Sequence, residues 1–229
     1  MNNNIRDEED LFNNKQTGGD ILGFDIDQSK VDHLQTGTPY IKHLGKEMMQ
    51  SLAQSDICDA TTDFSRLKEA DAVLLCVPTP LNQYREPDMS YVISTTETVA
   101  RHLREGQLVI LESTTYPGTT EEVMIPLLEK HSGLITGKDF YVAYSPERED
   151  PGNPNFNTAK IPKVVGGHGE DALKLAQALY DTAILQTVPV SDTKTAEAVK
   201  ITENVFRAVN IALVNELKVV YAKMGIDIH

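Results

Sequence analysis

Short apolar runs alternate with longer amphipathic segments along most of the chain. Strands are predicted at residues 21–25, 72–77, 108–111 and 141–144, and a weaker one at 164–165. The middle runs have no polar side, which is typical of strands that are covered on both faces of a parallel sheet. The spacing of apolar positions between them predicts helices over 93–103 and 173–179, and a further helix starting at Thr119 and Thr120.

A much longer helix is predicted from about Asp192 onward. Apolar residues recur there every three or four positions from Val199 to Met224, and neither glycine nor proline interrupts the segment before Gly225. A continuous apolar stripe on one long helix needs a surface to cover it. The stripe therefore predicts a homodimer formed through this helix.

Strands that alternate with helices through short connections indicate a doubly wound α/β fold with a parallel sheet. We expect three parts: a polar N-terminal segment at residues 1–20, the doubly wound domain at 21–190, and the start of a helical domain at 191–229.

Composition and charge argue against several classes of binding partner. The 229 residues include 21 basic and 34 acidic side chains, which gives a net charge of −13. Nucleic acids and anionic membranes bind clustered lysine and arginine, so neither partner is expected. Two cysteines cannot form a disulfide framework, no apolar run approaches the roughly 20 residues of a membrane span, and the polar N-terminus does not resemble a signal peptide. These features predict a cytoplasmic protein.

Polar clusters follow four of the predicted strands. Asp25 ends the first, Pro78-Thr79-Pro80 the second, a hydroxyl-rich turn at 112–120 the third, and an acidic segment at 145–152 the fourth. Ligands of doubly wound sheets bind at the carboxyl ends of the strands, and an acid there can accept hydrogen bonds from an adenosine ribose. Each cluster alone has an ordinary interpretation as a loop residue, strand terminator or helix cap. Four in succession favour a binding site.

Lys200 and Asn204 lie four residues apart on the long helix and so share a face. Together they could stabilise an oxyanion. Spacing alone favours an exposed face, on which Glu197, Glu203 and Arg207 would make ordinary surface pairs.

The remaining candidates indicate no chemistry. Cys58 falls in a polar segment interpreted as a loop and Cys76 in a buried strand, so both thiols are interpreted as structural. The histidines lack the spacing of metal ligands, and no metal site is predicted.

Taken together, these segments resemble the UDP-glucose/GDP-mannose dehydrogenase family of nucleotide-sugar 6-dehydrogenases. The resemblance runs from Ile21 to His229, and the SPEREDPGN segment is similar to members that oxidise UDP-N-acetylhexosamines. The matching stretches are GFDIDQSKVDHLQTG, DAVLLCVPTPL, LESTTYPGTTEEV, YSPEREDPGN, KVVGG and AEAVKITENVFRAVNIALVNEL.

The resemblance implies a Rossmann-like NAD-binding domain and oxidation of C6 of a UDP-sugar from alcohol to carboxylate, with two hydride transfers, for polysaccharide biosynthesis. It further implies site residues. The NAD ligands would be Asp25, Lys30, Thr79 and Thr114; the catalytic residues Thr114, Glu147, Lys200 and Asn204; and the substrate ligands Glu147, Arg148, Glu149, Lys200 and Asn204.

Two departures from the family's pattern matter. No strand with a G-x-G-x-x-G turn precedes Ile21, and the family's catalytic cysteine lies in a Gly-Gly-His-Cys segment that this sequence does not contain. We therefore expect a domain without its first strand and glycine-rich turn, in an incomplete chain that is inactive by itself. The alternative is a non-catalytic dimerisation or regulatory module. A β-hydroxyacid dehydrogenase is disfavoured by the 145–148 cluster and by Lys200 with Asn204.

Overall fold

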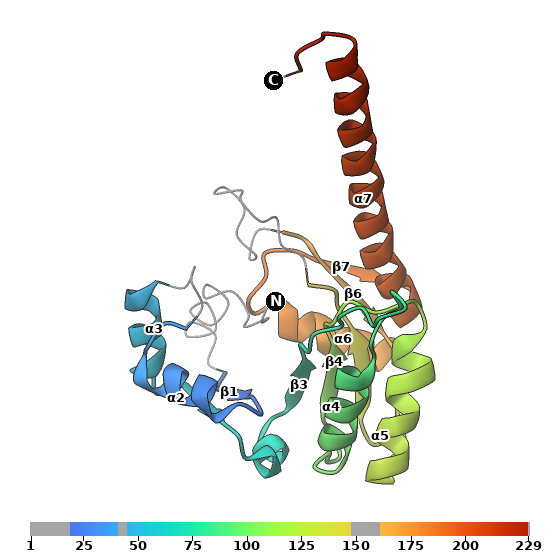
Figure 1. The fold of residues 1–229 in the computed structure, drawn as a ribbon. Coiled ribbons are helices and arrows are strands. Elements are labelled where there is room, and N and C mark those ends of the chain that lie inside the picture. Colours follow the sequence, from blue (N-terminus) through green and yellow to red (C-terminus); the bar gives the residue numbers. More distant parts are fainter. Residues whose placement is uncertain (1–18, 41–44, 148–160, 229) are drawn as a thin grey trace.

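The computed structural model describes residues 19–40, 45–147 and 161–228 (Figure 1). Its strands are β1 Ile21–Phe24, β2 Cys58–Thr61, β3 Ala72–Leu75, β4 Leu108–Leu111, β5 Tyr141–Tyr144, β6 Lys163–Gly167 and β7 Thr187–Val190. Its helices are α2 Gln28–Thr36, α3 Lys46–Ala53, α4 Ser90–Ala100, α5 Ile125–Ser132, α6 Glu170–Tyr180 and α7 Thr193–Lys223, with short turns η1 Phe64–Glu69 and η2 Thr120–Met124.

The strands form two sheets. β1 pairs with β2, and the other five run in the order β3-β4-β5-β6-β7. All pairs are parallel except β5 with β6, where Ala143 lies opposite Gly167 and Tyr144 opposite Gly166. The expectation of a wholly parallel sheet is therefore wrong at this pair. Apolar runs show that a strand is buried but carry no information about its direction.

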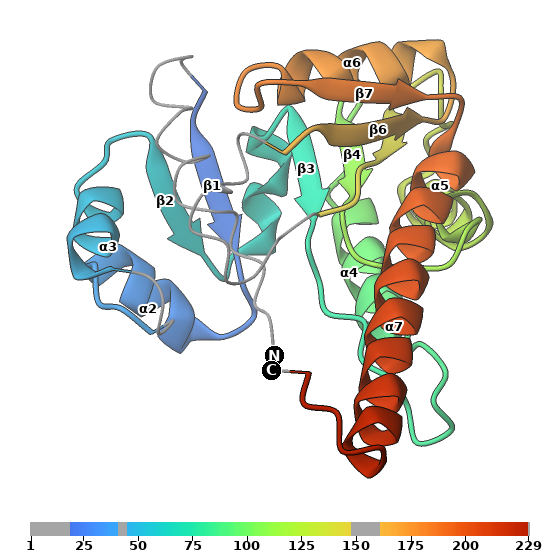
Figure 2. The same ribbon diagram turned by 90° about the horizontal axis from the view of Figure 1, so that it is seen from above.

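In Figure 2, β1 and β3 lie apart on either side of η1, and they belong to different sheets. Among the described residues, no strand pairs with the edge of β1 opposite β2 or with the edge of β3 opposite β4. Within the described ranges, the two sheets are therefore not joined to each other by strand pairing.

The five-stranded sheet is covered on both faces. Leu108 and Ile110 of β4 belong to a buried cluster with α6, whereas Val109 and Leu111 belong to a second cluster with α4 and α5. Successive side chains of a strand point to opposite faces, so a strand buried on both sides must be apolar at every position. This arrangement explains the continuous apolar runs and confirms the doubly wound prediction.

Two adjacent glycines let helices approach β6 closely. A Cβ on Gly166 would lie 2.2 Å from the carbonyl oxygen of Asp192, just before α7, and one on Gly167 would lie 2.3 Å from the backbone nitrogen of Leu173 in α6. Any side chain at either position would push a helix off the sheet. The Gly166-Gly167 pair therefore fixes where α6 and α7 begin relative to β6.

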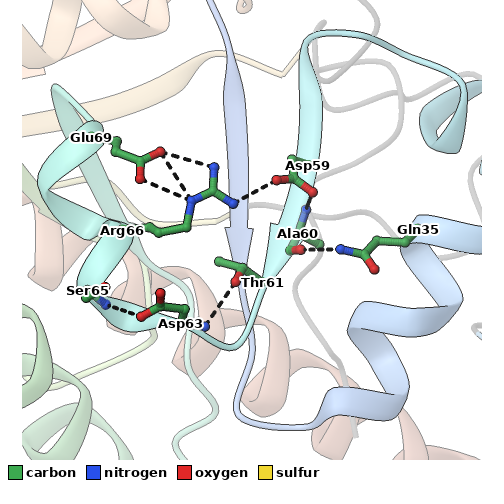
Figure 3. Close-up of polar contacts among 8 residues, drawn as sticks. All are labelled: Gln35, Asp59, Ala60, Thr61, Asp63, Ser65, Arg66 and Glu69. Carbon is green, nitrogen blue, oxygen red and sulfur yellow. Dashed lines mark hydrogen bonds and ion pairs between the residues drawn. The ribbon is translucent and has the colours of Figure 1, made fainter.

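An arginine links β2 to the following turn (Figure 3). Arg66 of η1 donates to Asp59 of β2 at 2.8 Å and makes paired contacts with Glu69 at 3.1–3.2 Å. Its hydrogen bond is the main cause of a lowered pKa for Asp59. Cys58 is the first residue of β2, so its interpretation as a loop residue is wrong.

The long helix was predicted from about Asp192, and α7 begins at Thr193 with the Asp192 carboxylate accepting from the backbone of Thr195. Its first turn packs on the sheet, with Ala196 fully buried. Beyond that turn the helix projects away from both sheets (Figure 1). No helix within the described ranges has the length and apolar character needed to cross a membrane.

Candidate active site

The first group of candidate residues lies after β1. Asp25 follows that strand directly, and its carboxylate contacts the ammonium of Lys30 in α2 at 2.9 Å. It also accepts from the backbone of Asp27 at 2.9 Å, and Asp27 in turn caps α2. The phenol of Tyr40 is nearby: burial, together with the Asp25 charge, raises its pKa to about 12. The structure thus brings together the two predicted adenosine ligands, with the Asp25 carboxylate about one-third exposed.

The second group links the ends of β3 and β4. The hydroxyl of Thr79 donates to the carbonyl oxygen of Thr114 at 2.7 Å, although 35 residues separate them. Ser113 supports the same junction, because its hydroxyl accepts from the backbone nitrogen of Val77 and donates to the carbonyl oxygen of that residue. The two threonines predicted as NAD ligands are therefore held against each other by a hydrogen bond.

The third group joins the end of β5 to α7. Lys200 donates to the backbone carbonyl of Glu147, and Asn204 lies one turn further along α7, half-buried. Two residues 53 positions apart, both predicted to be catalytic, are thus in contact. The predicted substrate ligands Arg148 and Glu149 lie outside the described residues.

A buried charged cluster, which sequence reasoning missed, lies beside this group. Lys163 opens β6 with its ammonium 3.3 Å from Glu112, 3.2 Å from Glu147 and 4.9 Å from the ring centre of Tyr180. Glu112 accepts from the Tyr180 hydroxyl and from the Cys76 thiol, the latter at 3.2 Å. Cys76 follows β3 rather than lying within it. The side chains of Glu112 and Lys163 are 1% and 7% exposed, so this ion pair is almost fully desolvated.

A second carboxylate missed by sequence reasoning is Glu197 of α7. It accepts hydrogen bonds from the backbone nitrogens of Gly118 and Thr120 and from the Thr120 hydroxyl. It is fully buried, so the expectation of a surface pair is wrong. Burial raises its pKa, with the hydrogen bonds from Thr120 and Gly118 opposing that shift.

Glu197 also changes the interpretation of the 112–120 turn. Helix N-termini bind anions, and this hydroxyl-rich turn opens a helix. Its amides at Gly118 and Thr120 already hydrogen-bond a resident carboxylate. These two amides are therefore not available to bind a cofactor phosphate.

Sequence held only faint signs of these residues. Lys163 is a charged residue at the head of an otherwise apolar strand, and Glu112 ends a strand buried on both faces. Charged residues at such positions need buried partners. Nothing in the sequence indicated that Glu197 is buried, because its hydrogen-bond partners come from a turn 77 residues earlier in the chain.

Comparison with known families gives two consecutive matches. A sequence model described as "UDP-glucose/GDP-mannose dehydrogenase family, NAD binding domain" matches residues 11–184, and the model of the same family's central domain matches 194–229. The two matches meet close to the start of α7.

Individual proteins also match nearly the whole of this chain. "Protein CapL" of Staphylococcus aureus is 37% identical over 94% of this chain and 50% of its own length. "UDP-N-acetyl-D-glucosamine 6-dehydrogenase" of Pseudomonas aeruginosa is 36% identical over the same shares. The solved UDP-N-acetylmannosamine dehydrogenase of Pyrococcus horikoshii superposes with a TM-score of 0.86 at 35% identity, over 95% of this chain and 51% of that one. The chain spans about half the length of the curated relatives it matches.

Proposed function

The chain belongs to the UDP-glucose/GDP-mannose dehydrogenase family, and we propose that it serves NAD-dependent oxidation of a UDP-N-acetylhexosamine at C6, from alcohol to carboxylate. The observation that carries this proposal is the contact between Lys200 and Glu147. It joins the NAD-binding portion of the chain to the start of the family's central domain, at the carboxyl end of β5. Relatives named for UDP-N-acetyl sugars support that substrate class.

The residues after β1 suit the adenosine end of NAD. The Asp25 carboxylate is partly exposed and fixed by Lys30 and by the backbone of Asp27, so it can accept hydrogen bonds from ribose hydroxyls. Thr79 and Thr114 would line the nicotinamide end. Alcohol-to-carboxylate oxidation releases two hydrides from C6, and two NAD molecules bound in turn would accept them.

Glu147, Lys200, Asn204 and Thr114 are proposed to perform the proton and charge chemistry. The Glu147 carboxylate can act as general base toward a water that Thr114 helps to position. The Lys200 ammonium and the Asn204 amide, one helical turn apart, can stabilise an oxyanion at C6. Arg148 and Glu149 complete the proposed set of substrate ligands.

Binding calorimetry on the chain tests the NAD portion of this proposal. Asp25→Ala should weaken NAD binding about 10-fold or more, because one lost hydrogen bond to a charged acceptor is worth roughly 1.5–3 kcal/mol. The matched control is Asp32→Ala on the exposed side of α2, which should leave the affinity unchanged. Equal affinity in wild type and Asp25→Ala would contradict the assignment of Asp25.

The substrate portion is tested with UDP-N-acetylglucosamine and UDP-glucose, by binding and by NADH formation. Preference for the N-acetylated sugar is expected. If neither sugar binds and no NADH forms, the catalytic proposal fails for this chain and the alternative of a non-catalytic module remains.

We propose that the chain dimerises through the exposed apolar stripe on α7, whether or not the chain is catalytic. Dimerisation is also what the alternative of a non-catalytic module requires. Members of the stripe follow one face of the helix at steps of three and four: Phe206, Val209, Leu213, Leu217, Val220 and Met224. Phe206 is 71% exposed in the single chain, an unusual state for a large apolar side chain within a continuous apolar stripe. Light scattering should give a dimer for the wild type and a monomer for Leu213→Asp; a monomeric wild type would contradict the proposal.

A further inference from the structure

The buried cluster around Lys163 includes Glu147, and its other members have no role in the chemistry proposed above. Its members come from five separate parts of the fold: Glu112 after β4, Lys163 at the head of β6, Tyr180 at the end of α6, Cys76 after β3, and Glu147 after β5. The side chain of Glu147 is 20% exposed, compared with 1% for Glu112 and 7% for Lys163. The cluster thus extends from the interior of the sheet to a residue of the proposed site.

Stability does not account for this cluster. Bringing a lysine and a glutamate out of water costs several kcal/mol per ion, and their mutual attraction often fails to recover that cost. Apolar side chains of similar volume would stabilise the same position equally well or better. A buried ion pair at the carboxyl ends of strands, where ligands of such sheets bind, is better explained by a task at the site.

The geometry indicates that task. Lys163 contacts two carboxylates, those of Glu112 and Glu147. The Glu112 carboxylate is held in turn by hydrogen bonds from Tyr180 and Cys76. Lys200 contacts the backbone of Glu147, whereas Lys163 contacts its side chain. The two lysines therefore hold different parts of one residue.

We propose that Lys163 is a positioning residue, anchored by Glu112, that holds the Glu147 carboxylate in place for general-base chemistry. This inference rests on the proposed function for its catalytic meaning, because Glu147 is the base in that proposal. Its structural part, that Lys163 sets the environment of the Glu147 carboxylate, can be tested without turnover.

The test variant is Lys163→Met with Glu112→Gln. It removes both charges of the buried pair together, and the glutamine oxygen can still accept from Tyr180. Lys163→Gln with Glu112→Gln is made in parallel as a second variant that keeps a polar side chain near Tyr180. The matched control removes an exposed pair, Lys174 and Glu170, whose charges are 2.6 Å apart on α6.

The primary readout is the carboxyl ¹³C signal of Glu147 in glutamate-labelled protein, assigned as the signal that disappears in Glu147→Gln. In both Lys163 variants it should move toward the signals of solvent-exposed glutamates, whereas in the control pair it should stay where it is. An unmoved signal in the folded Lys163 variants overturns the proposal, and so does an equal movement in the control.

Turnover separates this inference from the proposed function. A misplaced base should lower kcat about 10²-fold with little change in KM, while the control variant keeps the wild-type rate. The ¹³C signal decides whether Lys163 sets the environment of Glu147 even where the chain forms no NADH, so failure of this inference and failure of the proposed function are distinguishable.

Discussion

Replacing Glu197 by alanine should destabilise the chain more than any change on the outer face of α7. The Glu197 carboxylate accepts three hydrogen bonds from the start of η2: two from backbone nitrogens, at Gly118 and Thr120, and one from the Thr120 hydroxyl. These residues are buried, so water cannot readily replace the lost acceptor. The bonds are also the direct link between α7 and the turn that carries Thr114.

The size of the effect follows from these contacts. Each buried donor left without an acceptor costs about 1–3 kcal/mol, and the lost methylene adds about 0.8 kcal/mol. The lower end of the range applies, because removing the carboxylate also removes the free-energy cost of burying its charge. That cost is the reason why burial raises the pKa of Glu197. Glu197→Ala should therefore lower the free energy of unfolding by about 3–5 kcal/mol, a large share of the roughly 5–15 kcal/mol typical of a domain.

Urea unfolding followed by far-ultraviolet circular dichroism measures this difference. The control is Glu216→Ala, which changes an exposed glutamate on the same helix and should cost no more than about 0.5 kcal/mol. If the two variants unfold within about 1 kcal/mol of each other, the start of η2 does not depend on Glu197, and the buried-acceptor reasoning is refuted.

Other predictions concern pH, backbone packing and the surface. Burial raises the pKa of Glu197 above its ordinary 4.5, so its contribution to stability is present below that pH and is lost as the pH rises through the folded value. The stability of wild type minus that of Glu197→Gln should therefore fall with rising pH in urea titrations; a rising difference would contradict this. Gly166→Ala, whose Cβ would meet backbone at 2.2 Å, should lower the melting temperature sharply, whereas Gly45→Ala, with nothing within 4 Å, should not. Arg66→Met should lower it slightly, and added salt should shrink the difference, because the Arg66–Glu69 contact is exposed; a salt-independent loss would point to packing.

Local pattern determined a large part of the fold. Four apolar runs predicted β1, β3, β4 and β5. The reason is clearest for β4, which is buried at every position, because a strand covered on both faces must be apolar along its whole length. The spacing in α7 predicted its start to within a residue, because Asp192 is a helix cap and the apolar stripe follows. The two strands without such runs, β2 and β7, gave no comparable signal. β2 is the clearer case, since the sequence CDAT carries a charge in mid-strand.

Proximity in sequence also fixed the contact between Asp25 and Lys30, which needs only one turn of α2 after β1. The rest of the candidate site depends on contacts between distant parts of the chain. Thr79 meets Thr114, Glu147 meets Lys163 and Lys200, and Glu197 reaches Thr120. Side-chain type and spacing describe what each of these residues could do, but burial and pairing across elements decide what each one does. For that reason the sequence by itself determined the family, the apolar strands and the long helix, whereas the direction of β6, the buried Lys163 cluster and the role of Glu197 were decided only by the tertiary structure.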